Sequence, residues 1–398
     1  MTTFAKSISK LRSSQIRDLM ALATRPGIIS FAGGMPGNDL FPINDMDTLY
    51  NGLTEGQKQV AMQYGPTAGL PILLESLAEF LAKKGLPVAE NKLMITTGSL
   101  QAINILAKAF IDAGDEVLLE NPSFIGAISA FKSYDANLVT IPLKSDGICI
   151  ESLRKHLDTS WVNPKFLYIT PNFHNPAGTV YSSEVKRQLI ELMRDRDIPI
   201  IEDDAYSDLA FYPEDTEQLK PIMSQDHSGI DVCYTGSFSK IIGPGLRLGW
   251  MLVPPHIYEK CELIKQSIDA CSPSFTQVLA DQFLRSGLIY SYLDRVREEY
   301  KRRSLAMMEE LRKHLPEYVQ WNEPRGGFYI WLQLPEGVDT LEILRIAIHK
   351  GVVFVTGKTF DPLEKETNNM RISFCNTSVE IIQKGIPIIA EAIREVCD

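Results

Sequence analysis

The sequence predicts an α/β protein in which a large domain, built on a mostly parallel seven-stranded sheet, is followed by a smaller α+β domain. Short β-rich runs alternate with runs of helical period through the middle of the chain, the pattern of a parallel sheet covered by helices. Most of these runs are continuously apolar, as strands buried on both faces are. After residue 255 long helices and a few short strands replace this pattern. We therefore expect an N-terminal arm over 1–43, a large domain over 44–286 and a small domain over 287–398.

The predicted elements follow in chain order. The seven strands of the large sheet cover 92–97, 116–121, 137–143, 165–171, 199–203, 232–238 and 248–254. Apolar residues at helical spacing predict helices over 100–112 and 183–196, and two long helices over 257–286 and 287–315. The small domain is expected to contain a strand over 326–334, a helix over 340–350 and a strand over 370–375. Glycines and prolines before residue 44 predict an extended arm.

The composition excludes several classes of protein. The 398 residues are 44% hydrophobic and 23% charged, as in an ordinary folded protein. A net charge of −10 opposes non-specific binding to nucleic acid, and no apolar run suggests a membrane span or a signal peptide. The six cysteines and six histidines show no metal-ligand spacing, so we expect free thiols and no metal site. These observations favour a cytoplasmic protein that binds neither nucleic acid nor membranes.

The segment 235–250 contains the densest group of chemically useful side chains. It places Lys240 beside the hydroxyls of Ser237 and Ser239, with Arg247 following after two glycines. A lysine at the edge of a buried site loses its proton more easily, which suits it to Schiff-base chemistry. Two hydroxyls and a guanidinium suit a phosphate dianion. The alternative is a lysine on a mobile glycine loop.

Three further segments place polar groups at predicted strand ends. Gly98, Ser99 and Leu100 pass from a strand into a helix, whose free N–H groups can bind phosphate, although Ser99 could simply cap that helix. Asp203 ends another strand, where a carboxylate can hold a cationic nitrogen; the alternative is that this acid and the next one cap a helix. Asn175 precedes a proline and can project its amide into a site, or it forms an ordinary turn.

With these motifs in place, the sequence resembles the pyridoxal-5′-phosphate (PLP) enzymes of fold type I, specifically the class I and II aminotransferases. The resemblance covers nearly the whole chain. It rests on Asn175-Pro-x-Gly, Asp203-x-x-Tyr206, Ser237-x-Ser-Lys240 followed by Arg247, and the late run 370–374 that contains Arg371.

The resemblance implies a PLP cofactor and roles for the motif residues. Lys240 forms the Schiff base and later moves the substrate Cα proton, and Asp203 pairs with the pyridine nitrogen. Asn175 and Tyr206 hydrogen-bond the phenolic oxygen of the ring, which makes Lys240, Asp203 and Tyr206 the catalytic residues. Phe124 stacks on the ring. The phosphate is held by Gly98, Ser99, Leu100, Ser237, Ser239 and Arg247.

The resemblance also implies how substrate and a second subunit are bound. Arg371, with Asn175, grips the substrate α-carboxylate; without the resemblance it would be an ordinary arginine at a strand edge. Tyr64 reaches the phosphate of a neighbouring subunit, so the active unit is expected to be a homodimer. His174 is expected in the wall of the site and not as a catalyst.

Within the family, the segments 14–17, 29–36 and 40–42 resemble the kynurenine/2-aminoadipate and aromatic aminotransferase branch. This likeness implies that Arg17 meets an acidic substrate side chain and that Gly34 lines the pocket, although Arg17 could equally form a surface salt bridge. The implied reaction moves the amino group of an aromatic or 2-aminoadipate-like amino acid to a 2-oxo acid, 2-oxoglutarate, by a ping-pong mechanism. Two alternatives are a PLP-dependent carbon–sulfur β-lyase and a non-enzymatic, aminotransferase-like effector-sensing module.

Overall fold

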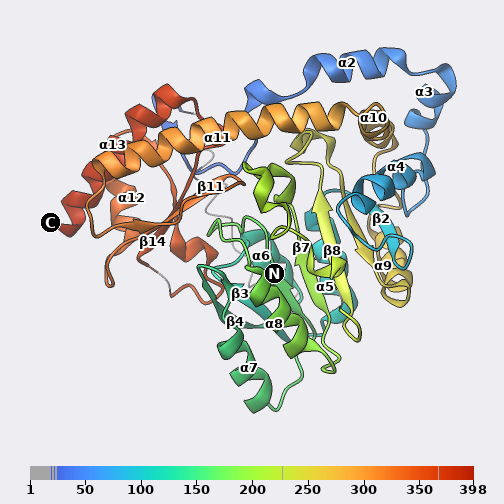
Figure 1. Cartoon of the computed structure of the whole chain (residues 1–398), viewed down its shortest axis with the longest axis horizontal. Coiled ribbons are helices and arrows are strands. Elements are labelled where there is room, and N and C mark those ends of the chain that lie inside the picture. The colour runs from blue at the N-terminus through green and yellow to red at the C-terminus, as the bar shows by residue number, and fades with distance from the viewer. Residues whose placement is uncertain (1–18, 20–21, 23–24, 226, 366) are drawn as a thin grey trace, which may run out of the picture.

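The computed structural model describes residues 19, 22, 25–225, 227–365 and 367–398, and its centre is an eight-stranded sheet in the order β2-β9-β8-β7-β6-β3-β4-β5 (Figure 1). The strands from β8 to β4 run parallel, whereas β9 is antiparallel to both of its neighbours. In chain order the strands are β2 (Lys92–Thr96), β3 (Glu116–Asn121), β4 (Asn137–Lys144), β5 (Gly147–Ile148), β6 (Leu167–Ile169), β7 (Ile200–Asp203), β8 (Val232–Ser237) and β9 (Gly249–Val253).

All seven predicted strands are present, but the predicted strand number was too low. The additional strand, β5, is two residues long and pairs antiparallel with the end of β4 across a short turn. An element of two residues is too short to show a hydrophobic period, so the sequence pattern could not reveal it.

Both faces of this sheet are buried, which explains why its strands are continuously apolar. Neighbouring residues of one strand enter different cores: Leu118 packs in one cluster, and Val117 and Leu119 pack in the other. Helices α5, α6 and α9 cover the face of Val117, and α4, α7, α8, α10 and α11 contribute to the other core. These helices span α4 (Pro71–Ala82), α5 (Ser99–Phe110), α6 (Ile125–Ser133), α7 (Ile150–Thr159), α8 (Ser183–Met193), α9 (Pro255–Ile268), α10 (Ser274–Arg285) and α11 (Leu288–His314).

The predicted long helix over 257–286 was wrong, because the chain breaks there into α9 and α10. Ala270, between the two helices, has a positive φ of 60°, and Pro273 is the N-cap of α10. A proline disfavours helical geometry in the residue before it and lacks the N–H that would continue a helix. The second long helix, α11, is continuous and runs along the molecule from α10 to α13 (Figure 1).

A second, four-stranded sheet in the order β10-β11-β14-β13 lies with α12 and α13 at the C-terminal end of the molecule (Figure 1). Its strand pairs are all antiparallel. The strand β1, from the N-terminal arm, pairs in parallel with β12 beside this sheet. The remaining bounds are β1 (Ile29–Ser30), α2 (Ile43–Gly52), α3 (Glu55–Met62), β10 (Gln320–Trp321), β11 (Tyr329–Gln333), α12 (Thr340–His349), β12 (Val352–Val353), β13 (Val355–Thr356), β14 (Asn369–Ser373) and α13 (Val379–Cys397).

Two observations bear on the character of the whole chain. None of the helices in the described ranges is long and apolar enough to cross a membrane. All six cysteines are free thiols, as expected from their spacing.

Candidate functional site

A cavity of about 310 Å³ lies where the strands of the large sheet end and the small sheet and the arm approach it. Parallel α/β sheets bind ligands outside the carboxyl ends of their strands, so this is the expected place for a site. Thirteen of the site residues expected from the sequence line this cavity: Gly34, Gly98, Ser99, Leu100, Phe124, Asn175, Asp203, Tyr206, Ser237, Ser239, Lys240, Arg247 and Arg371.

One end of the cavity is suited to an anion. Helix α5 points its N-terminus there, and its N-cap is Gly98, which provides no side chain; Ser99 is the first helical residue and does not cap the helix. Gly98 has a φ of +81°, and a Cβ atom on it would lie 3.0 Å from the guanidinium of Arg247. The bare N–H groups, the helix dipole and Arg247 together favour a doubly charged anion. The hydroxyls of Ser237 and Ser239 line the same cavity.

Lys240 follows β8 and extends into the cavity. Its Nζ donates a hydrogen bond to the Gly34 carbonyl oxygen at 2.8 Å and lies 5.5 Å from the centre of the Phe328 ring. Burial, together with the positive charges of Arg371 and Arg247, lowers the pKa of Lys240 to about 8. A pKa lowered in this way makes the neutral, nucleophilic form of the lysine accessible near neutral pH.

The two acids at the end of β7 have different surroundings. Asp203 faces the cavity and accepts hydrogen bonds from Tyr168 Oη at 2.7 Å and Thr235 Oγ1 at 3.1 Å. Burial raises the pKa of Asp203 to about 6 despite these bonds. Asp204 instead accepts hydrogen bonds from the backbone N–H and the hydroxyl of Ser207, the first residue of a short 3-10 turn. Asp204 is therefore bound locally by Ser207, although it is not the N-cap of that turn, whereas Asp203 lines the cavity.

Arg371 lies on β14, which has a neighbour on each side, so it is not an edge residue. Its Nη1 donates to Asn175 Oδ1 at 2.8 Å and its Nη2 to the Ala32 carbonyl oxygen at 2.7 Å. Arg371 as a whole is 2% exposed, and its Nε has no hydrogen-bond partner among the described residues. Because its visible partners are neutral oxygens, this buried cation favours an anionic ligand.

Tyr64 and His174 do not line the cavity. Tyr64 follows α3 and is 88% exposed, so within a single chain it does not reach the site. Arg17 lies outside the described residues. His174 is fully buried with its Nε2 3.2 Å from Glu120 Oε2 and is absent from the cavity lining, so its predicted position in the wall of the site was wrong. Within its own loop, the His174 ring accepts a hydrogen bond from the Ala177 N–H through its Nδ1.

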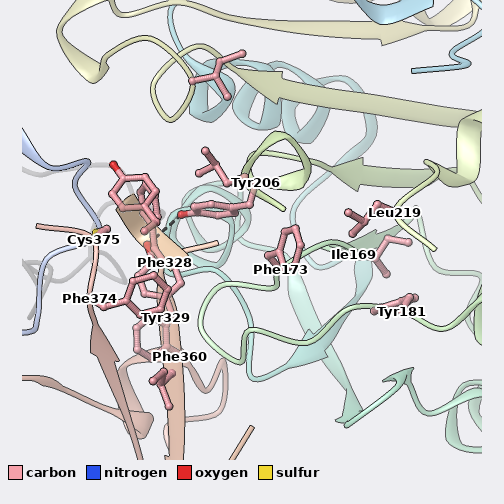
Figure 2. Close-up of a cluster of buried hydrophobic side chains, with 14 of the residues drawn as sticks. Ile169, Phe173, Tyr181, Tyr206, Leu219, Phe328, Tyr329, Phe360, Phe374 and Cys375 are labelled. Carbon is pink, nitrogen blue, oxygen red and sulfur yellow. Dashed lines mark hydrogen bonds between the residues drawn. The ribbon is translucent and has the colours of Figure 1, made fainter. Parts of the chain in front are cut away.

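The cavity also contains residues that the sequence did not point to: Ile125, Thr170, Ala205 and Tyr329. Tyr329 is the most informative, because its hydroxyl lies 3.0 Å from that of Tyr206 (Figure 2). It stands on β11, where Trp331 is paired with Arg371, so Tyr329 and Arg371 share a face of the small sheet. A β-strand over this segment was expected, but the register that brings Tyr329 next to Arg371 is a tertiary property.

The chain is similar to known proteins over nearly its whole length. The family model of aminotransferase class I and II matches residues 43–389. The chain is 35% identical to aromatic-amino-acid aminotransferase 1 of Thermococcus litoralis, covering 98% of this chain and 94% of that protein. It is 33% identical to the 2-aminoadipate transaminase of Thermus thermophilus, covering 98% of this chain and 96% of that protein. The structure of a Pyrococcus horikoshii kynurenine aminotransferase in complex with PMP matches with a TM-score of 0.94 and 36% identity, covering 99% of this chain and 98% of that one.

The depressed pKa of Lys240 can be measured directly. In the cofactor-free protein, we expect acetylation of Lys240 by acetic anhydride to reach half its maximal rate near pH 8, because only the neutral amine reacts. Peptide mass spectrometry over a pH series measures this rate. Arg371→Met removes a nearby positive charge and should move the midpoint upward. A wild-type midpoint of about 10, the value of an ordinary lysine, would contradict the burial argument.

Proposed function

We propose a role for each cavity residue of this chain, which belongs to the class I and II aminotransferase family and is a PLP-dependent transaminase. The residues present fit PLP: an anion-binding helix end suits its phosphate, and a buried carboxylate suits its pyridine nitrogen. When bound, PLP supplies an aldehyde that bonds to amines and a cationic ring that withdraws electrons from the substrate α-carbon. The observation that carries the proposal is a single cavity that joins Lys240, Asp203 and Arg371.

Lys240 is proposed to hold the cofactor and then to act as the base. Because the pKa of Lys240 is lowered to about 8, an appreciable fraction of its amine is neutral near neutral pH. With PLP held in the cavity, the Nζ of Lys240 would be the group that takes the proton from the substrate α-carbon and holds it before it is returned. Its present partner, the Gly34 carbonyl, is a neutral acceptor and does not hold the lysine in its charged form.

The remaining cofactor contacts are proposed to orient the ring and tune its charge. Asp203 accepts a hydrogen bond from the pyridine nitrogen and keeps it protonated, and this new partner returns the raised pKa of the carboxyl toward its usual range. Asn175 and Tyr206 donate to the phenolic oxygen, and Phe124 stacks on the ring. The phosphate is bound by Ser99, Ser237, Ser239, Arg247 and the backbone from Gly98 to Leu100.

Arg371 is proposed to bind the substrate α-carboxylate, with Asn175 beside it and Gly34 in the pocket wall. We further propose aromatic or 2-aminoadipate-like amino donors and 2-oxoglutarate as acceptor in a ping-pong cycle. The relatives named for aromatic amino acids and 2-aminoadipate support this choice. A contact of Arg17 with an acidic side chain of the substrate is also proposed.

Half-reactions test the proposed function. The protein reconstituted with PLP should absorb visible light, and an aromatic or 2-aminoadipate donor alone should change this absorption. Adding 2-oxoglutarate should restore it, because the second half of the cycle reverses the first. A donor series followed by absorption ranks the amino acids.

The matched control for this experiment is a pair of lysine variants. Lys240→Ala should abolish the lysine adduct that borohydride fixes and slow the half-reaction at least ~100-fold, since the general base is lost. Lys260→Ala, at an exposed position of α9, should leave both unchanged. An adduct on another lysine in Lys240→Ala would refute the assignment. Pyruvate and ammonia from a β-substituted amino acid, without transamination, would identify a β-lyase instead.

Arg371→Ala is expected to weaken amino-acid and 2-oxo-acid binding roughly 30- to 1,000-fold, because it removes the cation that faces the carboxylate. Cofactor affinity should change less than about 3-fold. Arg371→Lys keeps the charge but loses the planar pair of donors, so it should recover only part of the loss. Titrations of substrate and PLP by absorption measure both affinities, and equal losses of the two would disprove the carboxylate role.

We propose that the active unit is a homodimer in which Tyr64 of one copy reaches the phosphate bound by the other. Tyr64 is 88% exposed, and it continues a group of exposed apolar and aromatic side chains on α2, α3 and α10. This group consists of Tyr50, Val60, Met62 and Phe275, and the rings of Tyr50 and Phe275 lie 5.7 Å apart. Exposed apolar patches of this kind favour association with another chain.

Mixing two inactive variants distinguishes a site that contains residues of both subunits from a site formed by one subunit alone. If Tyr64 completes the site of the other copy, a Tyr64→Ala copy paired with a Lys240→Ala copy has one intact site. We therefore expect mixed subunits to recover up to about half of the activity of a wild-type dimer, although each variant alone has little. Activity after subunit exchange measures the recovery. No recovery in a verified mixed dimer would exclude the shared site.

The division into an arm over 1–43, a large domain over 44–286 and a small domain over 287–398 is part of the proposal. It is supported by the two larger sheets, since one is built from β2 to β9 and the other from β10, β11, β13 and β14. A cytoplasmic location is likewise proposed. Its support is the six free thiols, which persist in a reducing compartment.

A further inference from the structure

Tyr329 is a second tyrosine in the cavity, and its hydroxyl is directed at Tyr206. The two hydroxyl oxygens lie 3.0 Å apart, and the rings meet edge to face with centroids 5.8 Å apart (Figure 2). Tyr329 is 2% exposed and Tyr206 is 4% exposed. A contact this short between two buried hydroxyls is a hydrogen bond, in which either oxygen can be the donor.

The Tyr329 side chain has close neighbours at its ring and at its hydroxyl. The guanidinium carbon of Arg371 lies 4.2 Å from its centroid, which is a stacked cation–π contact. On the arm, a Cβ atom at position 34 would lie 2.2 Å from the Tyr329 hydroxyl oxygen, so only glycine leaves room for it. The hydroxyl is therefore confined between Gly34 and Tyr206, and the ring supports Arg371.

Both tyrosines keep their protons at neutral pH. Burial raises the pKa of Tyr206 well above its ordinary value, and burial also raises that of Tyr329. The other charged or titratable groups around the pair are Arg371, Cys375 and Lys240, whose Nζ lies 5.9 Å from the Tyr206 ring. Each hydroxyl thus has a single proton to donate.

We propose that Tyr329 is a positioning residue that donates its proton to Tyr206 Oη and so directs the Tyr206 proton toward the phenolic oxygen of the cofactor. This inference rests on the proposed function of Tyr206 as a donor to that oxygen. If Tyr206 donates there, the hydrogen bond between the tyrosines can only be donated by Tyr329. The resulting two-step chain polarises the Tyr206 hydroxyl and stabilises negative charge on the phenolic oxygen more than Tyr206 alone does.

The test is a spectroscopic pH titration of the holoenzyme. A more stable phenolic anion lowers the pH at which the visible absorption of the lysine-bound cofactor changes. Tyr329→Phe removes the donated proton but keeps the ring on Arg371, so it should raise this midpoint by roughly 0.3–1 pH unit. Gly34→Ala, which displaces the Tyr329 hydroxyl, should shift the midpoint in the same direction.

A double-mutant cycle separates action through Tyr206 from a general disturbance. In a Tyr206→Phe background, Tyr329→Phe should move the midpoint by less than about 0.2 pH unit, because its acceptor is gone. Equal shifts in both backgrounds would overturn the proposal. Tyr300→Phe is the matched control: its ring also packs on Phe328, but its hydroxyl accepts a hydrogen bond from the Gly37 N–H, so the midpoint should not change.

Kinetics provide a second readout. Because Tyr329→Phe keeps the ring beneath Arg371, we expect kcat to fall several-fold and KM for the amino acid to stay within about 2-fold. A change in KM alone would show that Tyr329 supports substrate binding and would overturn the proposal. A wild-type protein without visible absorption or half-reaction would instead refute the proposed function. A normal wild type with an unshifted Tyr329→Phe midpoint refutes only the role of Tyr329.

Discussion

The buried guanidinium of Arg371 holds together three parts of the chain that are distant in sequence. From the small sheet it donates hydrogen bonds to Asn175, in the loop after β6, and to Ala32, in the N-terminal arm. It also stacks on the rings of Tyr329 and Phe360. No carboxylate among the described residues forms an ion pair with it. A desolvated cation without a counterion is costly, and an anionic ligand bound beside it would reduce that cost.

This uncompensated charge also affects the chemistry of the cavity. Arg371 and Arg247 line the same cavity as Lys240, and after burial itself their charges are what lower its pKa. The cavity therefore favours anionic groups and a neutral lysine amine. Asp203, buried at the end of β7, is the acidic group directed into the cavity, whereas Asp204 is engaged by Ser207 and Tyr234. The binding of anions and the activation of the lysine thus have a common electrostatic origin.

Much of the fold and of the site could be predicted from sequence because the relevant signals are local. A continuously apolar run that ends in a polar residue specifies both a buried strand and a group at its carboxyl end, and this is how Asp203 and Lys240 could be assigned. The break between α9 and α10 also has a local signal, Pro273. The apolar residues at helical spacing on both sides of this proline nevertheless favoured one continuous helix. The position of His174 depends on how its loop folds back over Glu120, which no pattern in the chain reveals.

The sequence by itself determined the α/β class, the order of the strands in the chain and the identity of the groups at their ends, since hydrophobic period and strand-end polarity are properties of neighbouring residues. Only the tertiary structure decided which of these groups meet. The register between β11 and β14 places Tyr329 beside Arg371, and the parallel pairing of β1 with β12 fixes the arm that brings Gly34 to Lys240. Register and docking depend on contacts between segments that are not neighbours in the sequence, and a one-residue slip in β11 would turn Tyr329 to the opposite face of its sheet.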